Sequence, residues 1–169
     1  VGNGVVQCWG DGYPIEEIED IAPMRGVAVG AVAGVAPTAS ELVFLVDQQG
    51  AVTWTRRLAA DWDVPQAFGA FGEGQPAGKA RQVEVGQFEV CVVTESDALQ
   101  CAPYDGSGLP TVAPSAVRTG VVSVGLGSAA ATFETRYRCT FETDGKARCQ
   151  GSNADGSLGN GAALVTPVP

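Results

Sequence analysis

Alternating apolar positions followed by a glycine recur three times along the chain. The pattern is V-x-V-G, and it occurs at 27–30, 83–86 and 122–125. Successive side chains of a β-strand point to opposite faces, so a valine at every second position predicts a strand with one buried face. Each of the three segments precedes a second periodic feature of the chain, a pair of residues ten positions apart.

Two of these pairs are cysteines. Cys91 and Cys101 are ten positions apart, and Cys139 and Cys149 repeat that spacing 48 residues later. A β-hairpin folded about its midpoint brings its two ends opposite each other, and turn-forming residues stand near both midpoints. Directly opposed residues on antiparallel strands are close enough for a disulfide, so we expect the pairs Cys91–Cys101 and Cys139–Cys149.

Weaker copies of the same hairpin occur earlier in the chain. Phe44 and Trp54 are ten positions apart and lie one repeat before the first cysteine pair. One further repeat back lies Cys8, whose expected mate would fall before Val1. The chain is therefore expected to begin within a hairpin. Cys8 is the odd cysteine, which pairs with an upstream residue, with another chain, or with nothing.

A fourth strand is predicted after Cys8 and after both cysteine-paired hairpins, in short apolar segments that end in proline at 18–23, 110–114 and 164–169. Repeats of 40–50 residues are typical of β-propeller blades. We therefore predict an all-β propeller or half-propeller of four-stranded antiparallel blades, with about three and a half blades in this chain. The predicted units are a partial blade at 1–24 and blades at about 25–80, 81–118 and 119–169.

Residues 149–161 carry the most specific motif. They follow the pattern C-W-G-x-N-x-x-G-Q-L-G-x-G, with Gln150 in place of Trp and Ser157 in place of Gln, and residues 8–10 keep the C-W-G start. In these segments the chain resembles the regulator of chromosome condensation repeat family of seven-bladed β-propellers, and its cysteine pairs are similar to those of secreted bacterial members. The resemblance implies a binding module, because the family includes an exchange factor for a small GTPase and an inhibitor of β-lactamases.

Composition limits the partners and the compartment. The 169 residues carry 19 acids and 10 bases, a net charge of −9, which disfavours a nucleic-acid backbone. The chain has no apolar run long enough for a membrane helix, so we expect no membrane insertion. Paired cysteines favour an extracellular, cell-surface or periplasmic location, the alternative being buried thiols in the cytosol. With Val1 in place of an initiator Met, we expect the chain to be mature, processed or partial.

Catalytic patterns are missing from the sequence. It contains no histidine, which excludes Ser-His-Asp and Cys-His arrangements, and the cysteine spacing does not fit a zinc site. Asp61 and Asp63 leave a carboxylate pair as an alternative. The recurring Asp-Gly steps are turns rather than a calcium site, because no dense acidic run surrounds them. We therefore expect no enzyme activity, no metal and no cofactor.

Surface features indicate where a partner would bind. The long connections after residues 30, 54 and 125 are expected on one face of the propeller, and variable loops on a rigid scaffold often carry binding residues. That face gathers aromatics that we name as candidate partner-binding residues: Tyr13, Trp62, Phe68, Phe71 and Tyr104. Packing between blades is the alternative for Phe68. The acidic cluster Glu16, Glu17, Glu19 and Asp20 is either a solvated loop or a contact for a basic partner.

Three and a half blades leave open sheet edges, which invite pairing with another chain. The sequence therefore predicts a non-enzymatic secreted or cell-surface protein-binding module, with a protein partner or a second chain that completes the propeller. The alternative is a structural subunit of an extracellular assembly or fibre.

Overall fold

The computed structural model describes residues 6–10, 13–18, 24–31, 41–58, 61–62, 66–68, 78–103, 115–128, 136–153 and 158. All regular structure in these ranges is β-strand, so the all-β prediction is confirmed. The described part of the chain contains no helix long and apolar enough to cross a membrane.

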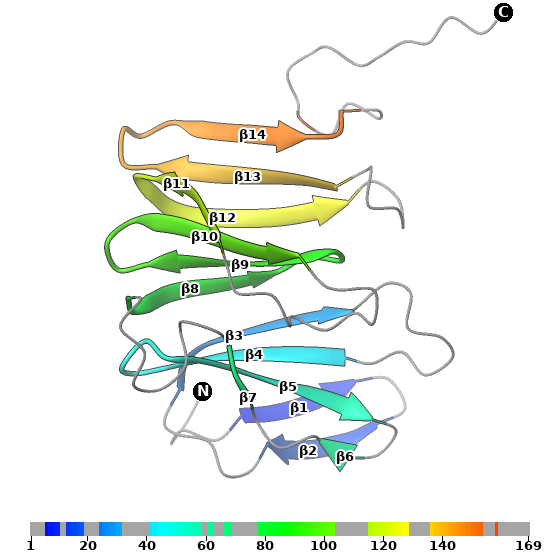
Figure 1. Ribbon diagram of the computed structural model, residues 1–169. Helices are drawn as coiled ribbons and strands as arrows, with labels where there is room; N and C mark the ends of the chain where they lie inside the picture. The colour runs from blue at the N-terminus through cyan, green and yellow to red at the C-terminus, as the bar shows by residue number, and fades with distance from the viewer. Residues whose placement is uncertain are drawn as a thin grey trace, which may run out of the picture.

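The strands form successive antiparallel sheets that follow one another in chain order (Figure 1). Blade 1 consists of β1 (Val6–Gly10) and β2 (Tyr13–Ile18). Blade 2 consists of β3 (Met24–Ala31), β4 (Glu41–Asp47) and β5 (Val52–Leu58), with β6 (Asp61–Trp62) and β7 (Gln66–Ala67) both paired to β5.

The remaining strands form two more blades. Blade 3 consists of β8 (Ala80–Val85), β9 (Glu89–Thr94), β10 (Ala98–Pro103) and β11 (Ser115–Thr119). Blade 4 consists of β12 (Val121–Ser128), β13 (Arg136–Glu142) and β14 (Ala147–Gly151). The first strand of blade 3, β8, touches the first strands of blades 2 and 4, β3 and β12, as expected for a partial β-propeller.

The hairpins occupy equivalent positions in blades 2, 3 and 4. Phe44 lies opposite Trp54, Cys91 opposite Cys101, and Cys139 opposite Cys149. Both predicted disulfides are present. The three turns share a residue with positive φ, at Gly50 (84°), Asp97 (60°) and Gly145 (79°). In each turn this residue donates its N–H to the carbonyl three residues earlier.

The predicted fourth strands were misplaced. In blade 1 the strand is Tyr13–Ile18, which shares only Ile18 with the predicted segment. In blade 3 it is Ser115–Thr119, which begins directly after the predicted segment 110–114. Proline has no N–H to donate to a strand ladder, so in blade 3 the paired residues begin after Pro114. In blade 1 the strand instead precedes Pro23. The predicted segment 164–169 lies outside the described residues.

The valine repeat in blade 4 was also assigned out of register. The residue opposite Cys139 is Gly125, whereas the residue opposite Cys91 is Glu84 and the one opposite Phe44 is Ala28. The segment equivalent to 27–30 and 83–86 is therefore 124–127, two residues later than predicted. A shift of two preserves the buried face of a strand, so the sequence pattern could not reveal it.

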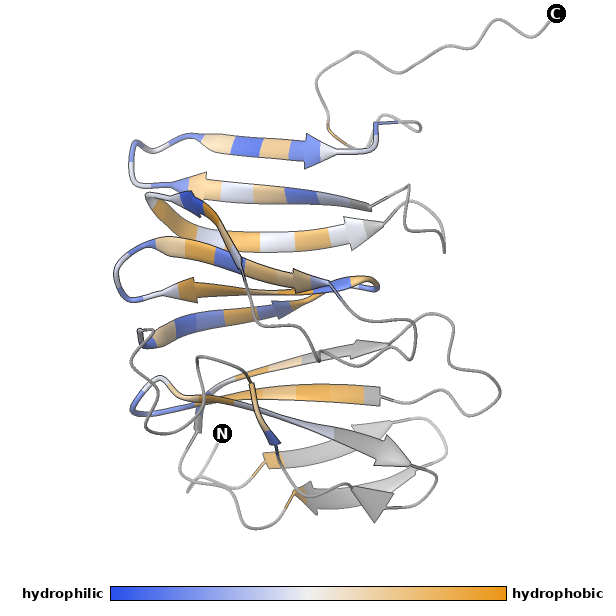
Figure 2. Ribbon diagram, viewed as in Figure 1, coloured by the Kyte–Doolittle hydropathy of each residue, from blue (hydrophilic) through white to orange (hydrophobic). Residues whose placement is uncertain are grey.

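Blades 1, 2 and 3 each pack one face on the next blade in the chain. We call this face, and its equivalent in blade 4, the forward face, and the opposite one the rear face. In blade 2 the forward residues Phe44 and Trp54 pack against Val83, Val90 and Val92 of blade 3. In blade 3 the forward disulfide Cys91–Cys101 packs against Val121, Val124 and Leu126 of blade 4. Because both of its faces are covered, β9 is hydrophobic along most of its length (Figure 2).

A β-bulge at the start of the first strand recurs in blades 2, 3 and 4. A bulge re-aims the side chain of its extra residue, here Arg25 in blade 2 and Arg81 in blade 3. Arg25 donates to the carbonyl of Ala80, and Arg81 donates to the equivalent carbonyl of Val121 at 3.0 Å. Equivalent arginines therefore join blade 2 to blade 3 and blade 3 to blade 4, and in blade 4 the position is taken by Val122.

Two further side chains of β8 hold the edge of β12. The side-chain amide of Gln82 donates to the carbonyl of Val124 at 3.0 Å and accepts from its N–H at 3.3 Å. Partial burial raises the pKa of the Glu84 carboxyl, an effect that a hydrogen bond from the backbone of Leu126 partly offsets. Side chains therefore take the place of a neighbouring strand at this inner edge.

The turn residues provide a matched pair of substitutions. A Cβ at Gly50 would lie 2.6 Å from the Cβ of Lys79 and 2.9 Å from its Cα, whereas nothing lies within 4 Å of a Cβ at Gly145. We expect Gly145→Ala to cost about 1 kcal/mol, the strain of positive φ alone, and Gly50→Ala to cost more than about 3 kcal/mol. Urea unfolding of both variants measures this difference, and equal losses would contradict the assigned contact.

The two disulfides should differ in reactivity. Cys91 and Cys101 are buried at the joint between blades 3 and 4, whereas Cys149 is exposed. A reducing thiolate must reach a sulfur atom, so Cys139–Cys149 should open first under mild dithiothreitol. Thiol trapping followed by peptide mass spectrometry measures the order, and simultaneous loss of both bonds would show that burial does not control it.

Candidate functional site

The structure describes only some of the predicted partner-binding residues. Tyr13 lies in β2 and Trp62 in β6, but their side chains are outside the described residues, as are Phe71 and Tyr104 altogether. Cys8 lies in β1 opposite Glu16, and its sulfur is not described either. The binding roles of these four aromatic residues and the pairing of Cys8 stay predictions.

The fifth candidate, Phe68, lies in the core. Its side chain is fully buried and packs edge to face against Phe44, with ring centroids 5.3 Å apart. The packing alternative that the sequence left open therefore describes this residue, and we do not include it in a binding surface.

The acidic cluster is only partly described. Glu16 and Glu17 lie in β2, opposite Cys8 and Gln7, whereas Glu19 and Asp20 are outside the described residues. The choice between a solvated cluster and a contact for a basic partner stays open.

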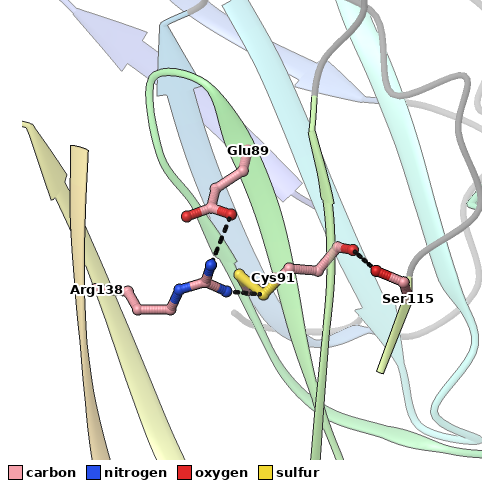
Figure 3. Close-up of a disulfide and its surroundings, with 5 residues drawn as sticks. Glu89, Cys91, Ser115 and Arg138 are labelled. Carbon is pink, nitrogen blue, oxygen red and sulfur yellow. Dashed lines mark hydrogen bonds and ion pairs between the residues drawn. A yellow bond between two sulfur atoms is a disulfide. The ribbon is translucent and has the colours of Figure 1, made fainter. Parts of the chain in front are cut away.

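A buried carboxylate and an arginine accompany the disulfide of blade 3 (Figure 3). Arg138 of blade 4 donates to Sγ of Cys101 at 3.1 Å and lies 3.7 Å from the carboxylate of Glu89. Glu89, Cys91 and Cys101 have ligand atoms within 4.8 Å of one another. The two sulfur atoms are bonded to each other in the disulfide, however, and a cysteine binds a metal as the thiolate. The oxidised protein therefore has no metal centre in this cluster.

The forward face of blade 4 is open. The equivalent residues Val46 and Val93 are 1% and 0% exposed in blades 2 and 3, whereas Phe141 in blade 4 is 47% exposed. Ala147 and Cys149 are exposed as well, beside Phe141 on the same face. The forward face of blade 4 therefore exposes an apolar residue to solvent at a position that blades 2 and 3 bury.

The rear face of blade 2 is partly uncovered at its first strand, β3. Val27 is 38% exposed, whereas the equivalent residues Val83 and Val124 are 5% and 4% exposed because the preceding blade covers them. Blade 1 covers the outer part of blade 2, where Val6 and Ile18 pack against Val43 and Leu45. The described chain therefore shows one open forward face and one partly open rear face.

The joint between blades 3 and 4 differs from the other joints in chemistry. The rear face of β4 carries Val43 and Leu45, and that of β9 carries Val90 and Val92. The equivalent residues of β13 are Arg138 and Thr140. A cavity of about 400 Å³ lies at this joint, lined by Leu99, Val117, Arg118, Arg138, Thr140, Arg148, Cys149 and Gln150.

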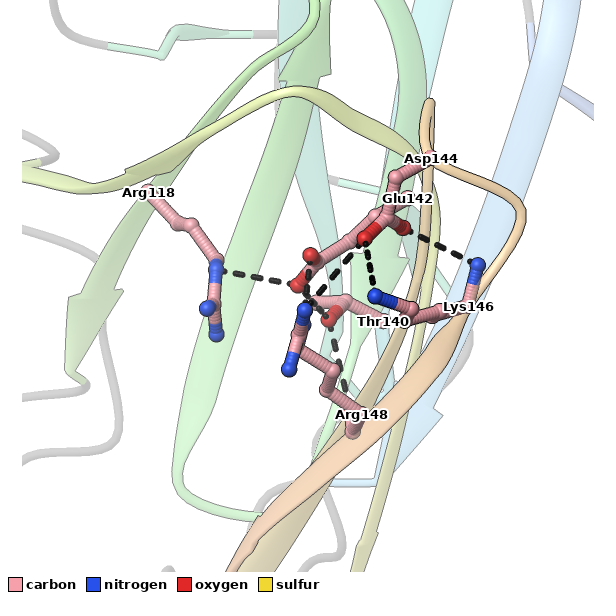
Figure 4. Close-up of polar contacts among 6 residues, drawn as sticks. All are labelled: Arg118, Thr140, Glu142, Asp144, Lys146 and Arg148. Atoms are coloured by element: carbon pink, nitrogen blue, oxygen red, sulfur yellow. Dashed lines mark hydrogen bonds and ion pairs between the residues drawn. The ribbon is translucent and has the colours of Figure 1, made fainter.

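Glu142 organises the cationic side of this cavity (Figure 4). The nearly buried carboxylate lies 2.9 Å from Nε of Arg118 and 2.7 Å from Nε of Arg148. Arg148 also lies 3.3 Å from the carboxylate of Asp144. Its hydrogen bond to Glu142 and the negative charge of that residue raise the pKa of the Arg148 guanidinium. One carboxylate therefore holds a cation from each of two blades at the rim of the cavity.

The sequence analysis missed these residues, although the chain contained a signal for them. The cysteine pairs align β9 with β13 position by position, and this alignment sets Arg138 against Val90 and Thr140 against Val92. It also sets Phe141 against Val93, an apolar residue in both blades. The exposure of Phe141 is a property of packing, which no alignment within one strand reveals.

Comparison with known proteins supports the fold but not a function. No family model matches the chain, and no curated protein matches its sequence. Among solved structures, human WBSCR16, a β-propeller of the regulator of chromosome condensation type, superimposes over 83% of this chain with a TM-score of 0.56 and 16% identity. The chain spans 37% of the length of that structure. It is therefore similar in fold to this propeller type.

Proposed function

We propose that this chain is a non-enzymatic protein-binding module built on a β-propeller scaffold, and that the forward face of blade 4 is its binding surface. The observation that carries the proposal is the exposure of Phe141 beside Cys139–Cys149, where the equivalent residues of blades 2 and 3 are buried. Burial of a phenylalanine side chain contributes about 1.5–3 kcal/mol, which favours occupation of this face.

The other joints indicate what the partner looks like. The forward faces of blades 2 and 3 pack against a first strand with apolar residues at alternate positions, such as Val83 and Val85 of blade 3 or Val124 and Leu126 of blade 4. The first N–H of that strand donates to the carbonyl of the preceding turn, as Val121 does to Asp97 at 2.9 Å. The equivalent turn residue of blade 4 is Gly145. A β-strand with an apolar face and a free N–H near Gly145 therefore fits this surface.

The proposed compartment is extracellular, cell-surface or periplasmic. Two disulfides stabilise the hairpins of blades 3 and 4, and such bonds persist in oxidising environments.

A structural subunit is the second candidate function, and the exposure of Val27 favours it. At the other joints, the residues equivalent to Val27 are covered by the forward face of the preceding blade. The forward face of blade 4 in a second copy of this chain could cover Val27 in the same way. Head-to-tail contacts of this kind extend into fibres unless they close into a ring.

Substitution of the two open positions separates these functions. Phe141→Asp should weaken partner binding at least about tenfold, because it places a charge in an apolar contact. If the partner is a second copy, Val27→Asp should abolish the assembly as well. Native mass spectrometry of the chain alone, and pull-down from the secreted fraction of its source, measure the two effects.

The control is Gln48→Asp, which adds the same single negative charge at an exposed residue in the turn of blade 2, away from the forward face of blade 4. It should leave binding intact. Retention of full binding and unchanged oligomer size by folded Phe141→Asp would overturn the proposal for this face.

A further inference from the structure

The rear face of blade 4 breaks the rule that governs the other joints. Its equivalents in blades 2 and 3 are all apolar at these positions, and they pack against the preceding blade. Arg138 and Thr140 replace them, at a cost in desolvation that Glu89 and Glu142 partly offset. A local departure from a repeated packing rule is a sign of a functional position.

The polar residues leave a cavity of about 400 Å³, within the range of small-ligand sites. Its two sides differ in chemistry. Leu99 and Val117 of blade 3 form an apolar side. The rest of the lining consists of three arginines and three further residues: Arg118, Arg138, Arg148, Thr140, Cys149 and Gln150.

The lining of the cavity is cationic, although the whole chain carries −9. Arg118, Arg138 and Arg148 line it. The carboxylates that pair with these arginines belong to Glu89, Glu142 and Asp144, which are not among the lining residues. The arginine lining favours an anion and opposes a metal cation.

Arg118 is the side chain best placed to bind that anion. Glu142 engages its Nε atom, and among the described residues no partner engages its two terminal nitrogens. Figure 4 shows these nitrogens directed away from Glu142. A fixed guanidinium with two available donors binds a carboxylate through paired hydrogen bonds.

We propose that this cavity, which we call the arginine cavity, binds a small carboxylate that carries an apolar group. The carboxylate contacts Arg118 at the rim, and the apolar group packs against Leu99 and Val117. The free carboxyl end of a peptide with an apolar last residue has this chemistry, as does an apolar carboxylic acid.

The test uses N-acetyl-L-leucine as the probe and N-acetyl-L-leucinamide as its uncharged match. Titration into the ¹⁵N-labelled full chain, with detection of the arginine Nε–H signals, reports binding at each guanidinium. We expect the acid to shift the signals of Arg118 and Arg148 with a Kd on the order of 1 mM, and the amide to bind at least about tenfold more weakly.

Two simpler anions test the ligand class. Acetate lacks the apolar group and should bind several-fold more weakly than N-acetyl-L-leucine. Inorganic phosphate should bind more weakly as well. If either anion binds as tightly as N-acetyl-L-leucine, the apolar side of the cavity contributes nothing and the proposal fails.

Matched variants locate the site. Arg118→Gln should weaken binding of the acid about tenfold, whereas Lys146→Gln removes the same charge outside the cavity and should change it less than about twofold. Chemical shifts of the β9 backbone report whether each variant keeps its fold. Equal binding of acid and amide, unchanged binding by folded Arg118→Gln, or equal losses in both variants would overturn the proposal.

Discussion

The fold depends on one constraint, which is that each sheet has two faces to cover and only its neighbours to cover them. Phe44 of blade 2 and the Cys91–Cys101 bond of blade 3 occupy equivalent positions, and the next blade buries both. An aromatic pair and a disulfide can both occupy this position because both are apolar and both lie across the two strands of the hairpin. The repeat therefore preserves the place of the contact rather than its chemistry.

Polar contacts then fix how the blades meet. The bulged arginines Arg25 and Arg81 each reach a carbonyl at the start of the next blade, and the turn carbonyls of Gly50 and Asp97 each accept an N–H from the same point. Blade 4 has Val122 in place of the arginine. The open forward face of blade 4 therefore has the apolar part of a joint but lacks the arginine contact.

The sequence predicted the parts of this fold that depend on spacing. Hairpins, disulfide pairs and the all-β class followed from the ten-residue pairs, because opposed residues of a hairpin have fixed separations. The fourth strands were misplaced because proline signals the edge of a blade but not its paired residues. The arginine cavity and the exposure of Phe141 depend on which blades pack against each other, and contacts between distant segments leave no periodic trace in one strand.

The central claim is that blade 4 presents an uncovered forward face where the other blades bury theirs. Hydroxyl-radical footprinting of the isolated chain, read by peptide mass spectrometry, measures side-chain exposure directly. The account predicts rapid oxidation of Phe141 and protection of Phe44 and Phe68 in the monomer. Protection of Phe141 to the level of Phe44 in a monomeric sample would contradict it.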